Sequence, residues 1–170
     1  TGAENFSVAL VGPVSRFRIE GNHFDTGLAD SEGEVFLWNV DGVDVIGNQF
    51  EDGDAAHWVY ADALTSGPRN HVVNVESNYF DVHTWTEGGP DLAASISFRN
   101  TSGGQIRANS IEGSPYNIVA DIELGPGTEK IVVDGNQAYL ASAIGAYVAG
   151  SARQVSIADA TSAAIIIGAF

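Results

Sequence analysis

Two carboxylates, Asp121 and Glu123, stand two residues apart in the second half of the chain. They fall in the segment 118–124, where apolar residues at every second position form a buried face and the two acids point outward. Residues two apart on an extended strand are separated by about 7 Å. Glycoside hydrolases hold their two carboxyl groups about 5 to 10 Å apart. The spacing therefore predicts Asp121 and Glu123 as a catalytic pair that would cleave a glycosidic bond.

A second group of residues has the chemistry to bind a sugar. Trp85 and His83 lie in the polar loop 83–89, where an exposed indole ring can stack on a sugar. Alternation places Arg99 outward on the segment 95–99, together with Ser95 and Ser97, and exposes His57 on the segment 57–61. The predicted substrate-binding residues are Trp85, His57, Arg99, His83, Asp54 and Asp91.

All of these residues also have a purely structural interpretation. Because the chain has 22 acidic residues, some pair will show catalytic spacing by chance, and solvation is the commoner role of a surface acid. The four His show no metal-ligand spacing. Glu51-Asp52-Gly53-Asp54 offers oxygen ligands suited to calcium but no repeated ligand pattern. We therefore predict no metal site and no cofactor.

The elements that must position these residues are specified by an internal repeat. The pattern is an apolar residue, any residue, an apolar residue, two residues, Asn, one residue and an apolar residue. It occurs at 17–24, 43–50, 73–80, 104–111 and 131–138. The Asn residues of the pattern are Asn22, Asn48, Asn78, Asn109 and Asn136, at intervals of 26, 30, 31 and 27 residues. A degenerate sixth copy runs through Val155-Ser156-Ile157, with Ala160 in place of Asn.

Each copy alternates with period two and is rich in Val, Ile and Phe, which indicates a strand with one buried face. A second apolar segment precedes each copy, at 8–11, 35–40, 58–61, 96–98, 118–124 and 146–149, and a last one follows at 165–167. Equivalent strands recur once per period, so each coil should pair with the next coil rather than with itself as a hairpin. Asn suits the corner because it tolerates left-handed backbone and its amide can hydrogen-bond to the Asn one coil away.

These patterns predict an all-β fold, a parallel β-helix (solenoid) of about six coils with an Asn corner ladder. The whole chain, 1–170, should be one domain. Stacked rows of inward residues should form the core, namely Phe17, Ile19, Val43, Val45, Val73, Val75, Ile131 and Val133.

Composition and charge exclude several classes of protein. With 44% hydrophobic residues the chain is too apolar for a disordered protein. Seven basic against 22 acidic residues give a net charge of -15, and this negative field would repel nucleic acid. No apolar run approaches the roughly 20 residues that span a bilayer, so we expect no membrane insertion. The absence of Cys excludes disulfides, thiolate zinc sites and Cys nucleophiles.

The Asn-containing motif and its spacing resemble those of the right-handed parallel β-helix proteins, the pectate-lyase-like superfamily, over nearly the whole chain. The resemblance implies the fold more than the activity, since that superfamily includes lyases, hydrolases, epimerases, phage tailspikes and adhesins. The Asp-Pro-His type motif of its mannuronan epimerases and the Gly-His-Gly of its polygalacturonases do not occur here. The acidic surface also favours a neutral or cation-bridged glycan over a polyanionic one.

The C-terminal part of the chain suggests association with other chains. The segment 139–170 is rich in Ala, Ser and Ile and carries few charges, which is typical of a surface that packs against other subunits. Phage tailspikes and tail fibres, which this chain resembles, are parallel trimers, so we expect a homotrimer with this segment at its axis. A sequence of this length with no Met also suggests a fragment of a longer protein.

The sequence leads to three functional hypotheses. The first is a tailspike-like or tail-fibre-like protein, extracellular or on a virion, that binds a bacterial surface polysaccharide and could also depolymerise it. The second is a secreted polysaccharide lyase, epimerase or hydrolase. The third is a structural adhesin segment without catalysis, in which Asp121, Glu123 and Trp85 could all be replaced without consequence.

Overall fold

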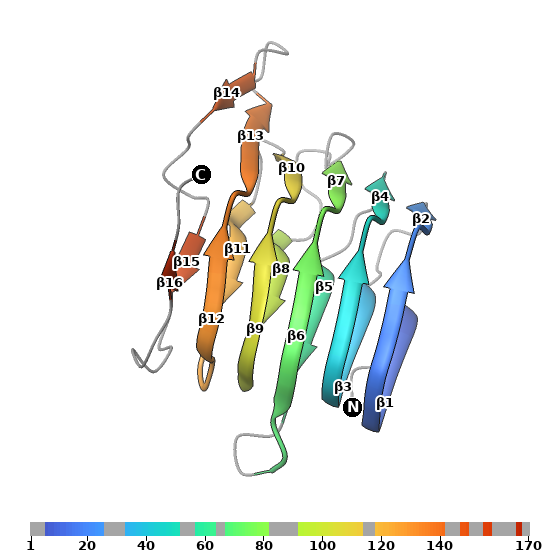
Figure 1. The fold of residues 1–170 in the computed structure, drawn as a ribbon. Coiled ribbons are helices and arrows are strands. Elements are labelled where there is room, and N and C mark those ends of the chain that lie inside the picture. The colour runs from blue at the N-terminus through green and yellow to red at the C-terminus, as the bar shows by residue number, and fades with distance from the viewer. Residues whose placement is uncertain are drawn as a thin grey trace.

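The computed structural model describes residues 6–25, 33–51, 57–63, 67–81, 92–113, 118–141, 147–149, 155–157 and 166–167. In these residues the chain is an all-β parallel solenoid built from two hydrogen-bonded sheets (Figure 1). The larger sheet bends around the molecule because β1 (Phe6–Glu20) and β3 (Gly33–Ile46) each run along two faces. β3 pairs with β5 through its first half and with β6 through its second half. The predicted fold class, a parallel β-helix, is confirmed.

The strands occupy three faces of the solenoid. The first face contains the first halves of β1 and β3, followed by β5 (His57–Asp62), β8 (Leu92–Phe98), β11 (Ile118–Leu124) and β15 (Val155–Ile157). The second face contains the second halves of β1 and β3, then β6 (Asn70–Glu76), β9 (Thr101–Arg107), β12 (Glu129–Asp134) and β16 (Ile166–Ile167). The third face contains β2 (His23–Asp25), β4 (Gln49–Glu51), β7 (Tyr79–Asp81), β10 (Ser110–Gly113), β13 (Gln137–Ala141) and β14 (Tyr147–Ala149). In this described part, no helix has the length and apolarity that crossing a membrane would require.

The C-terminal end of the solenoid differs from the prediction. Coils with a parallel strand on every face number five in the described residues, not about six. Val155–Ile157, expected to follow the corner-strand pattern of the second face, pairs instead with β11 on the first face, and Ile166–Ile167 takes the place beside β12. β14, expected as a first-face strand, pairs antiparallel with β13. The sixth copy has no corner Asn in its sequence, so it lacks the side chain that fixes this register in the other coils.

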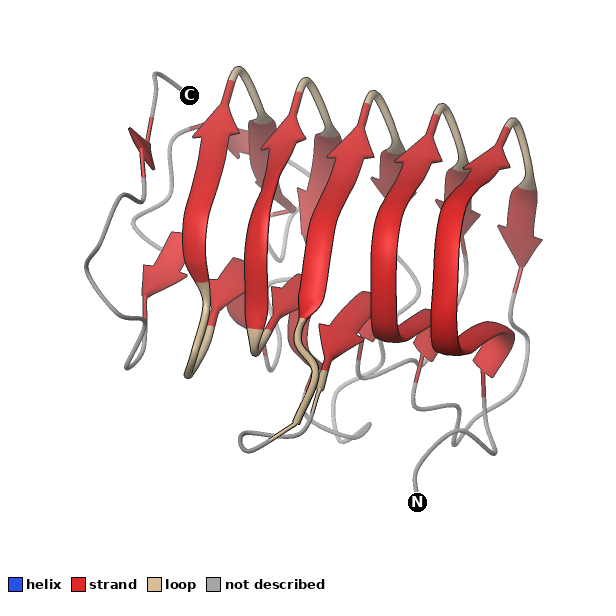
Figure 2. Cartoon of the chain, turned by 60° about the horizontal axis from the view of Figure 1, so that its bottom comes forward, coloured by secondary structure: helices blue, strands red, loops and turns tan. Residues whose placement is uncertain are grey.

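The predicted Asn ladder is present at the corner between the second and third faces, where the short turns line up in Figure 2. The backbone N–H and the Nδ2 of Asn48 both donate to Oδ1 of Asn78, at 2.9 and 3.1 Å. The same pair of bonds runs from Asn22 to Asn48, from Asn78 to Asn109 and from Asn109 to Asn136. Each amide from Asn48 onward also donates to a carbonyl of the preceding coil, as Asn78 does to Val45 O at 2.9 Å. The ladder therefore satisfies backbone and side-chain groups at a buried corner.

The left-handed backbone at this corner lies one residue before the Asn and not at the Asn itself. The five preceding residues have φ between 53° and 66°, and they are Gly21, Gly47, Ser77, Ala108 and Gly135. The expectation that Asn was chosen for its tolerance of this conformation is therefore wrong. The small preceding residue makes the turn, and Asn is selected for its amide.

A second left-handed position recurs five residues earlier in every coil, at Arg16, Gly42, Val72, Gly103 and Lys130, with φ between 51° and 80°. The sequence pattern gave no sign of it, because only two of these residues are Gly. Next to it, Gly104 stands in the inward row where neighbouring coils have Val73 and Ile131. A Cβ at Gly104 would lie 2.0 Å from the Val73 carbonyl oxygen, so no larger residue fits without moving backbone.

The core consists of the predicted inward rows with one exception. Val43, Val45, Val73, Val75, Ile131 and Val133 are fully buried, and Ile19 nearly so. Phe17 shares the row of Val43 but is 44% exposed, because it lies on the first coil and no further coil covers it in the described residues. On the third face, Phe24, Phe50 and Phe80 stack with ring centroids 4.8 and 4.7 Å apart. This distance equals the strand separation of about 4.8 Å, so identical residues at one register position stack directly.

The ladder leads to a prediction about stability. Asn78→Ala removes the acceptor for both donors of Asn48 and the donor to Val45 O, all at a buried site. Each unsatisfied buried group costs about 1–3 kcal/mol, so we expect the free energy of unfolding to fall by about 3–5 kcal/mol. The matched control is Asn22→Ala, which removes the amide of an exposed residue that donates to Asn48 Oδ1 and to Glu20 O, and which should cost about 1 kcal/mol. Urea denaturation measures both, and equal losses would contradict a cooperative buried ladder.

Candidate functional site

The first face presents side chains to the outside in rows that cross its strands. Phe36 on β3 is opposite Tyr60 on β5, Tyr60 is opposite Ser97 on β8, and Ser97 is opposite Glu123 on β11. In the adjacent row Trp38 is opposite Asp62. We call the seven residues Phe36, Trp38, Tyr60, Asp62, Ser97, Arg99 and Glu123 the aromatic–polar strip. Their neighbours Val35, Leu37, Val59, Ala61, Ile96, Phe98, Ile122 and Leu124 belong to the core, which places the strip on the outer side of the sheet.

The aromatic half of the strip is a continuous set of rings. The Phe36 ring lies 5.9 Å from Trp38 and 5.7 Å from Tyr60, both at tilted angles, and 4.8 Å from Phe6 in a stacked arrangement. Phe36 is nearly buried by its neighbours, whereas Trp38 and Tyr60 remain partly accessible. Aromatic rings held in this way offer an apolar surface of defined orientation.

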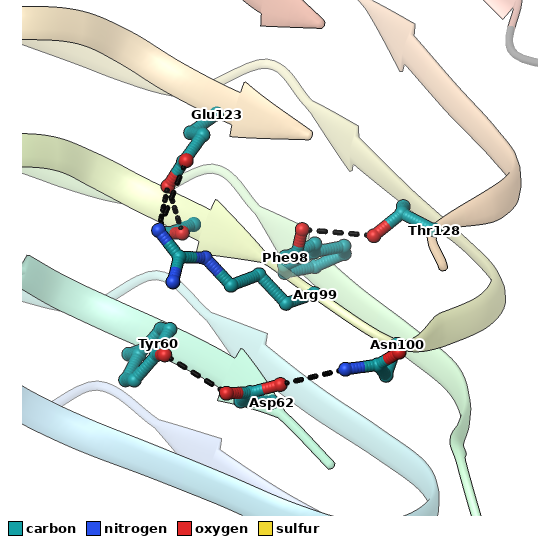
Figure 3. A network of polar contacts seen from close by, with 8 residues as sticks. Tyr60, Asp62, Phe98, Arg99, Asn100, Glu123 and Thr128 are labelled. Atoms are coloured by element: carbon teal, nitrogen blue, oxygen red, sulfur yellow. Dashed lines mark hydrogen bonds and ion pairs between the residues drawn. The ribbon is translucent and has the colours of Figure 1, made fainter. Parts of the chain in front are cut away.

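The polar half of the strip is built around Glu123 and Arg99 (Figure 3). Ser97 Oγ donates to Glu123 Oε2 at 2.5 Å, and Arg99 Nη2 donates to Glu123 Oε1 at 3.1 Å. The Glu123 side chain is 15% exposed and that of Arg99 is 38% exposed. Both carboxylate oxygens thus accept hydrogen bonds, and the ion pair fixes the position of the guanidinium at the surface.

Arg99 is further constrained from two sides. Its guanidinium carbon lies 5.9 Å from the centre of the Tyr60 ring, within the range of a cation–π contact. Gly125 leaves room for the stem of the side chain, since a Cβ there would lie 2.9 Å from Arg99 Cγ. Burial works against the charged form, but the electrostatic influence of Tyr60, Glu123 and Asp62 outweighs it and raises the pKa of Arg99. Its Nε is buried and has no hydrogen-bond partner among the residues that the structure describes.

Asp62 connects the strip to the corner between the first and second faces. Its Oδ2 accepts from Tyr60 Oη at 2.9 Å, and its Oδ1 accepts from Ala63 N at 2.7 Å and from Asn100 Nδ2 at 3.1 Å (Figure 3). Partial burial, followed by the charge and hydrogen bond of Asp62, raises the pKa of Tyr60 to about 12. The phenol is therefore held neutral as a donor to Asp62 in the ordinary pH range.

Beside the strip, three polar groups are buried and have no hydrogen-bond partner among the described residues. They are the two carboxylate oxygens of Glu34, the indole Nε1 of Trp58 and the hydroxyl of Ser95. Trp58 packs on Phe50 of the core. Ser95 and Ser97 are both fully buried, where alternation predicted that they would be exposed.

The structure brings together only some of the residues predicted to act. Glu123 on β11 and Arg99, directly after the neighbouring strand β8, form one ion pair. Asp121 lies on β11 two residues before Glu123, and His57 opens β5, but the side chains of both lie outside the described residues. The loop candidates Trp85, His83, Asp54 and Asp91 also lie outside them. The catalytic pairing of Asp121 with Glu123 stays a prediction.

The strip also contains residues that the sequence reasoning missed. The predicted inward and outward positions on β5 are wrong by one residue, because Val59 and Ala61 are fully buried. In the strand register His57 is opposite Ala94, and Tyr60 is opposite Ser97. Tyr60 and Asp62 are consequently the outward β5 residues. Trp38, which was not among the predicted binding residues, is partly exposed beside Phe36. Aligning β5 with β3 so that Val35 matches Val59 would have revealed the row Phe36–Tyr60.

The chemistry of the strip is that of noncovalent recognition. Ring faces lie beside a rigidly held guanidinium and two carboxylates, an arrangement that suits a ligand with apolar faces and many hydroxyl groups. Among the described residues no group of three or more His, Asp or Glu could hold a metal ion.

The raised pKa of Tyr60 leads to a prediction at alkaline pH. In the unfolded chain this phenol should titrate near 10, and in the folded protein near 12. Its contribution to stability is therefore complete below pH 10 and is lost as the pH rises from 10 to 12. Spectrophotometric titration of tyrosinate should show a late-ionising group that is missing in Tyr60→Phe, whose stability should fall less steeply over the same interval. A Tyr60→Phe protein that retains the late ionisation would contradict this assignment.

No protein-family model matches the chain, and comparison with curated proteins and with solved structures gives no match. The structure establishes the parallel β-helix fold, which is consistent with the resemblance to pectate-lyase-like proteins but shows no family.

Proposed function

We propose that the aromatic–polar strip binds a polysaccharide and that the protein is a glycan-recognition β-helix. The observation that carries the proposal is the run of rings Phe36, Trp38 and Tyr60 on an outer sheet face, continuing into the Arg99–Glu123 pair. Sugars present apolar C–H faces to aromatic rings and hydroxyls to charged and polar groups, so both halves of the strip would be used by one ligand.

The rigidity of the strip supports binding. Every polar member has a partner within the protein: Ser97 and Arg99 hold Glu123, while Tyr60 and Asn100 hold Asp62. All of these residues except Asn100 lie on or directly after strands of one sheet. Side chains that are already in place lose little conformational entropy on binding, which favours affinity for a flexible chain of sugars.

The charge of the strip bears on the class of glycan. Two carboxylates, Asp62 and Glu123, stand against one guanidinium, and the chain as a whole carries a net charge of -15. A polyanionic glycan would be repelled at long range unless cations intervened. We therefore propose a neutral or cation-bridged polysaccharide as the ligand, specifically one from a bacterial surface.

Cleavage by Asp121 and Glu123 belongs to the proposal as its enzymatic extension. In the structure Glu123 accepts bonds from Ser97 and Arg99, which supports a role in fixing Arg99 against the ligand. The alternatives are a secreted lyase, epimerase or hydrolase, and an adhesin segment that binds no small ligand.

A glycan array followed by affinity measurements on the best hit tests this function. Trp38→Ala and Arg99→Ala should each weaken binding at least about tenfold, the effect of losing about 1.4 kcal/mol of stacking or charged hydrogen bonding. Asn74→Ala is the matched control, because Asn74 lies on the second face, away from the strip, and its side chain donates to Asp44 of the neighbouring coil. Equal affinity in all three variants would refute binding at the strip, and no glycan hit would favour the adhesin. The same samples test cleavage. If the wild-type protein releases oligosaccharide, and the double variant Asp121→Asn, Glu123→Gln binds the glycan but releases none, the pair is catalytic.

A tailspike-like assembly adds a further expectation, a homotrimer that is extracellular or part of a virion. Multi-angle light scattering should then give three times the chain mass of 17.8 kDa. A monomer at high concentration would contradict the tailspike proposal and would leave a monomeric secreted enzyme or an adhesin segment.

A further inference from the structure

A row of buried polar residues crosses the first face directly beside the aromatic–polar strip. In the strand register Glu34 on β3 is opposite Trp58 on β5, and Trp58 is opposite Ser95 on β8. All three residues are fully buried, and we call them the buried row. Two residues further along the same strands, which is about 7 Å, lie Phe36 and Tyr60 of the strip. A ligand that lies on the strip is therefore next to the buried row.

The backbone places Glu34 and Ser95 on the same side of the sheet as the strip. Glu34 is followed by the core residue Val35, and Ser95 is followed by the core residue Ile96. Because side chains alternate along a strand, Glu34 and Ser95 are directed to the outer side. Between them, the ring of Trp58 packs on Phe50, with 6.3 Å between the ring centroids. The row thus holds an indole between a carboxylate and a hydroxyl.

The polar atoms of the buried row have no hydrogen-bond partner among the residues that the structure describes. They are both carboxylate oxygens of Glu34, Nε1 of Trp58 and Oγ of Ser95. Within the described residues one other buried side-chain atom shares this state, and it is Nε of Arg99, which belongs to the strip. Each such group costs about 1–3 kcal/mol, and a charged group costs more. The unsatisfied groups are therefore concentrated in one place.

Buried polar side chains with a structural role are paired in this protein. At the corner between the first and second faces, Asn70 Oδ1 accepts from Val40 N at 3.0 Å. At the same corner Thr128 Oγ1 donates to Phe98 O at 2.8 Å. The groups of the buried row make no such bond to the described part of the fold. This difference favours a role in binding for the row over a structural role.

The donors and acceptors of the buried row match one chemical group. The ionised carboxylate of Glu34 only accepts, the indole N–H of Trp58 only donates, and the hydroxyl of Ser95 does both. A cation would satisfy the carboxylate but leave the indole N–H unpaired, and an anion would be repelled by Glu34. Two neighbouring hydroxyl groups, a vicinal diol, supply two donors for the carboxylate oxygens and two acceptors for the N–H and O–H.

We propose that the buried row binds the vicinal diol of a terminal sugar, an inference that rests on the proposed glycan binding by the strip. Glu34 accepts a hydrogen bond from each hydroxyl, while Trp58 and Ser95 each donate to one of them. Because the row is buried, only the end of a glycan chain can place hydroxyls there, and the following sugars lie along the strip. The protein is then selective for glycan ends that carry a free diol.

The test uses the full chain and neutral hexasaccharides of glucose, mannose and galactose, each with its non-reducing terminal diol either free or methylated. By calorimetry, Glu34→Gln and Ser95→Ala should each weaken binding of the free form at least about tenfold, the effect of losing about 1.4 kcal/mol. Methylation should weaken binding to the wild type similarly and cause no further loss in Glu34→Gln. The matched control is Glu76→Gln, because Glu76 lies on the second face and bonds Gln105, and it should bind as the wild type does.

NMR of the indole N–H groups adds a readout that a purely structural role would not move. The Trp58 signal, identified by its loss in Trp58→Phe, should shift with the free hexasaccharide and stay in place with the methylated one. Far-UV circular dichroism should be unchanged in the variants. Ser95→Ala removes a single oxygen, so it tests the row even if Glu34→Gln does not fold.

The outcomes separate this inference from the proposed function. Binding that is weakened by Trp38→Ala but not by Glu34→Gln, Ser95→Ala or methylation would overturn the diol site and leave glycan binding by the strip intact. No binding of any hexasaccharide or array glycan would overturn both. Stabilisation of the wild type by calcium that is lost in Glu34→Gln would identify a cation as the occupant, and this too would overturn the diol site.

Discussion

The hydrogen bonds between corner Asn side chains are the interaction on which the rest of this fold depends. In a parallel solenoid the coils differ in length, here by as much as five residues between successive Asn positions, and nothing in a strand alone prevents it from slipping by two. The amide of Asn78 is simultaneously an acceptor for two donors of one coil and a donor to the next, so a slipped coil would leave several buried groups unpaired. Fixing one point per coil in this way brings the Phe24–Phe50–Phe80 rings into direct stacking and aligns the outward rows of the first face.

The same constraint explains how much of the structure could be predicted from the sequence. The Asn period and the flanking alternation were sufficient for the fold class, the ladder and nearly all inward residues. The backbone conformation was not, because Ser77 and Ala108 give no sign in the sequence of the left-handed turn that Gly21 makes with ease. The prediction fails after the last Asn of the repeat. There β15 and β16 pair with other strands than predicted, because no corner amide specifies their register. On β5 two adjacent residues, Trp58 and Val59, are both buried, and strict alternation fails for that reason.

The candidate site was harder to predict because its members are joined only through the stacking of coils. Glu123 and Arg99 were identified individually, but their ion pair depends on the register between β8 and β11, and Tyr60 joins them through a third strand. The total charge also did not predict the composition of the strip. The net charge of -15 describes a distant field, whereas the strip itself combines rings, one cation and two acids in short-range contact. A surface of this kind is determined by local pairing between strands, whereas the overall acidity acts only at long range.

Separation of core and surface by alternation also explains how such a fold can lack the familiar enzyme motifs of proteins that share it. Inward residues such as Val59 and Ile96 maintain the stack, whereas outward residues such as Trp38 and Tyr60 are partly exposed and lie outside the core. Each coil contributes one residue to a row, so a change at Arg99 or Trp38 alters the outer surface locally and leaves the ladder intact. The residues that build the fold are therefore different from the residues that form the outer surface, and the fold alone does not specify a function. The ladder determines where the outward side chains stand, and the identity of those side chains determines what they bind.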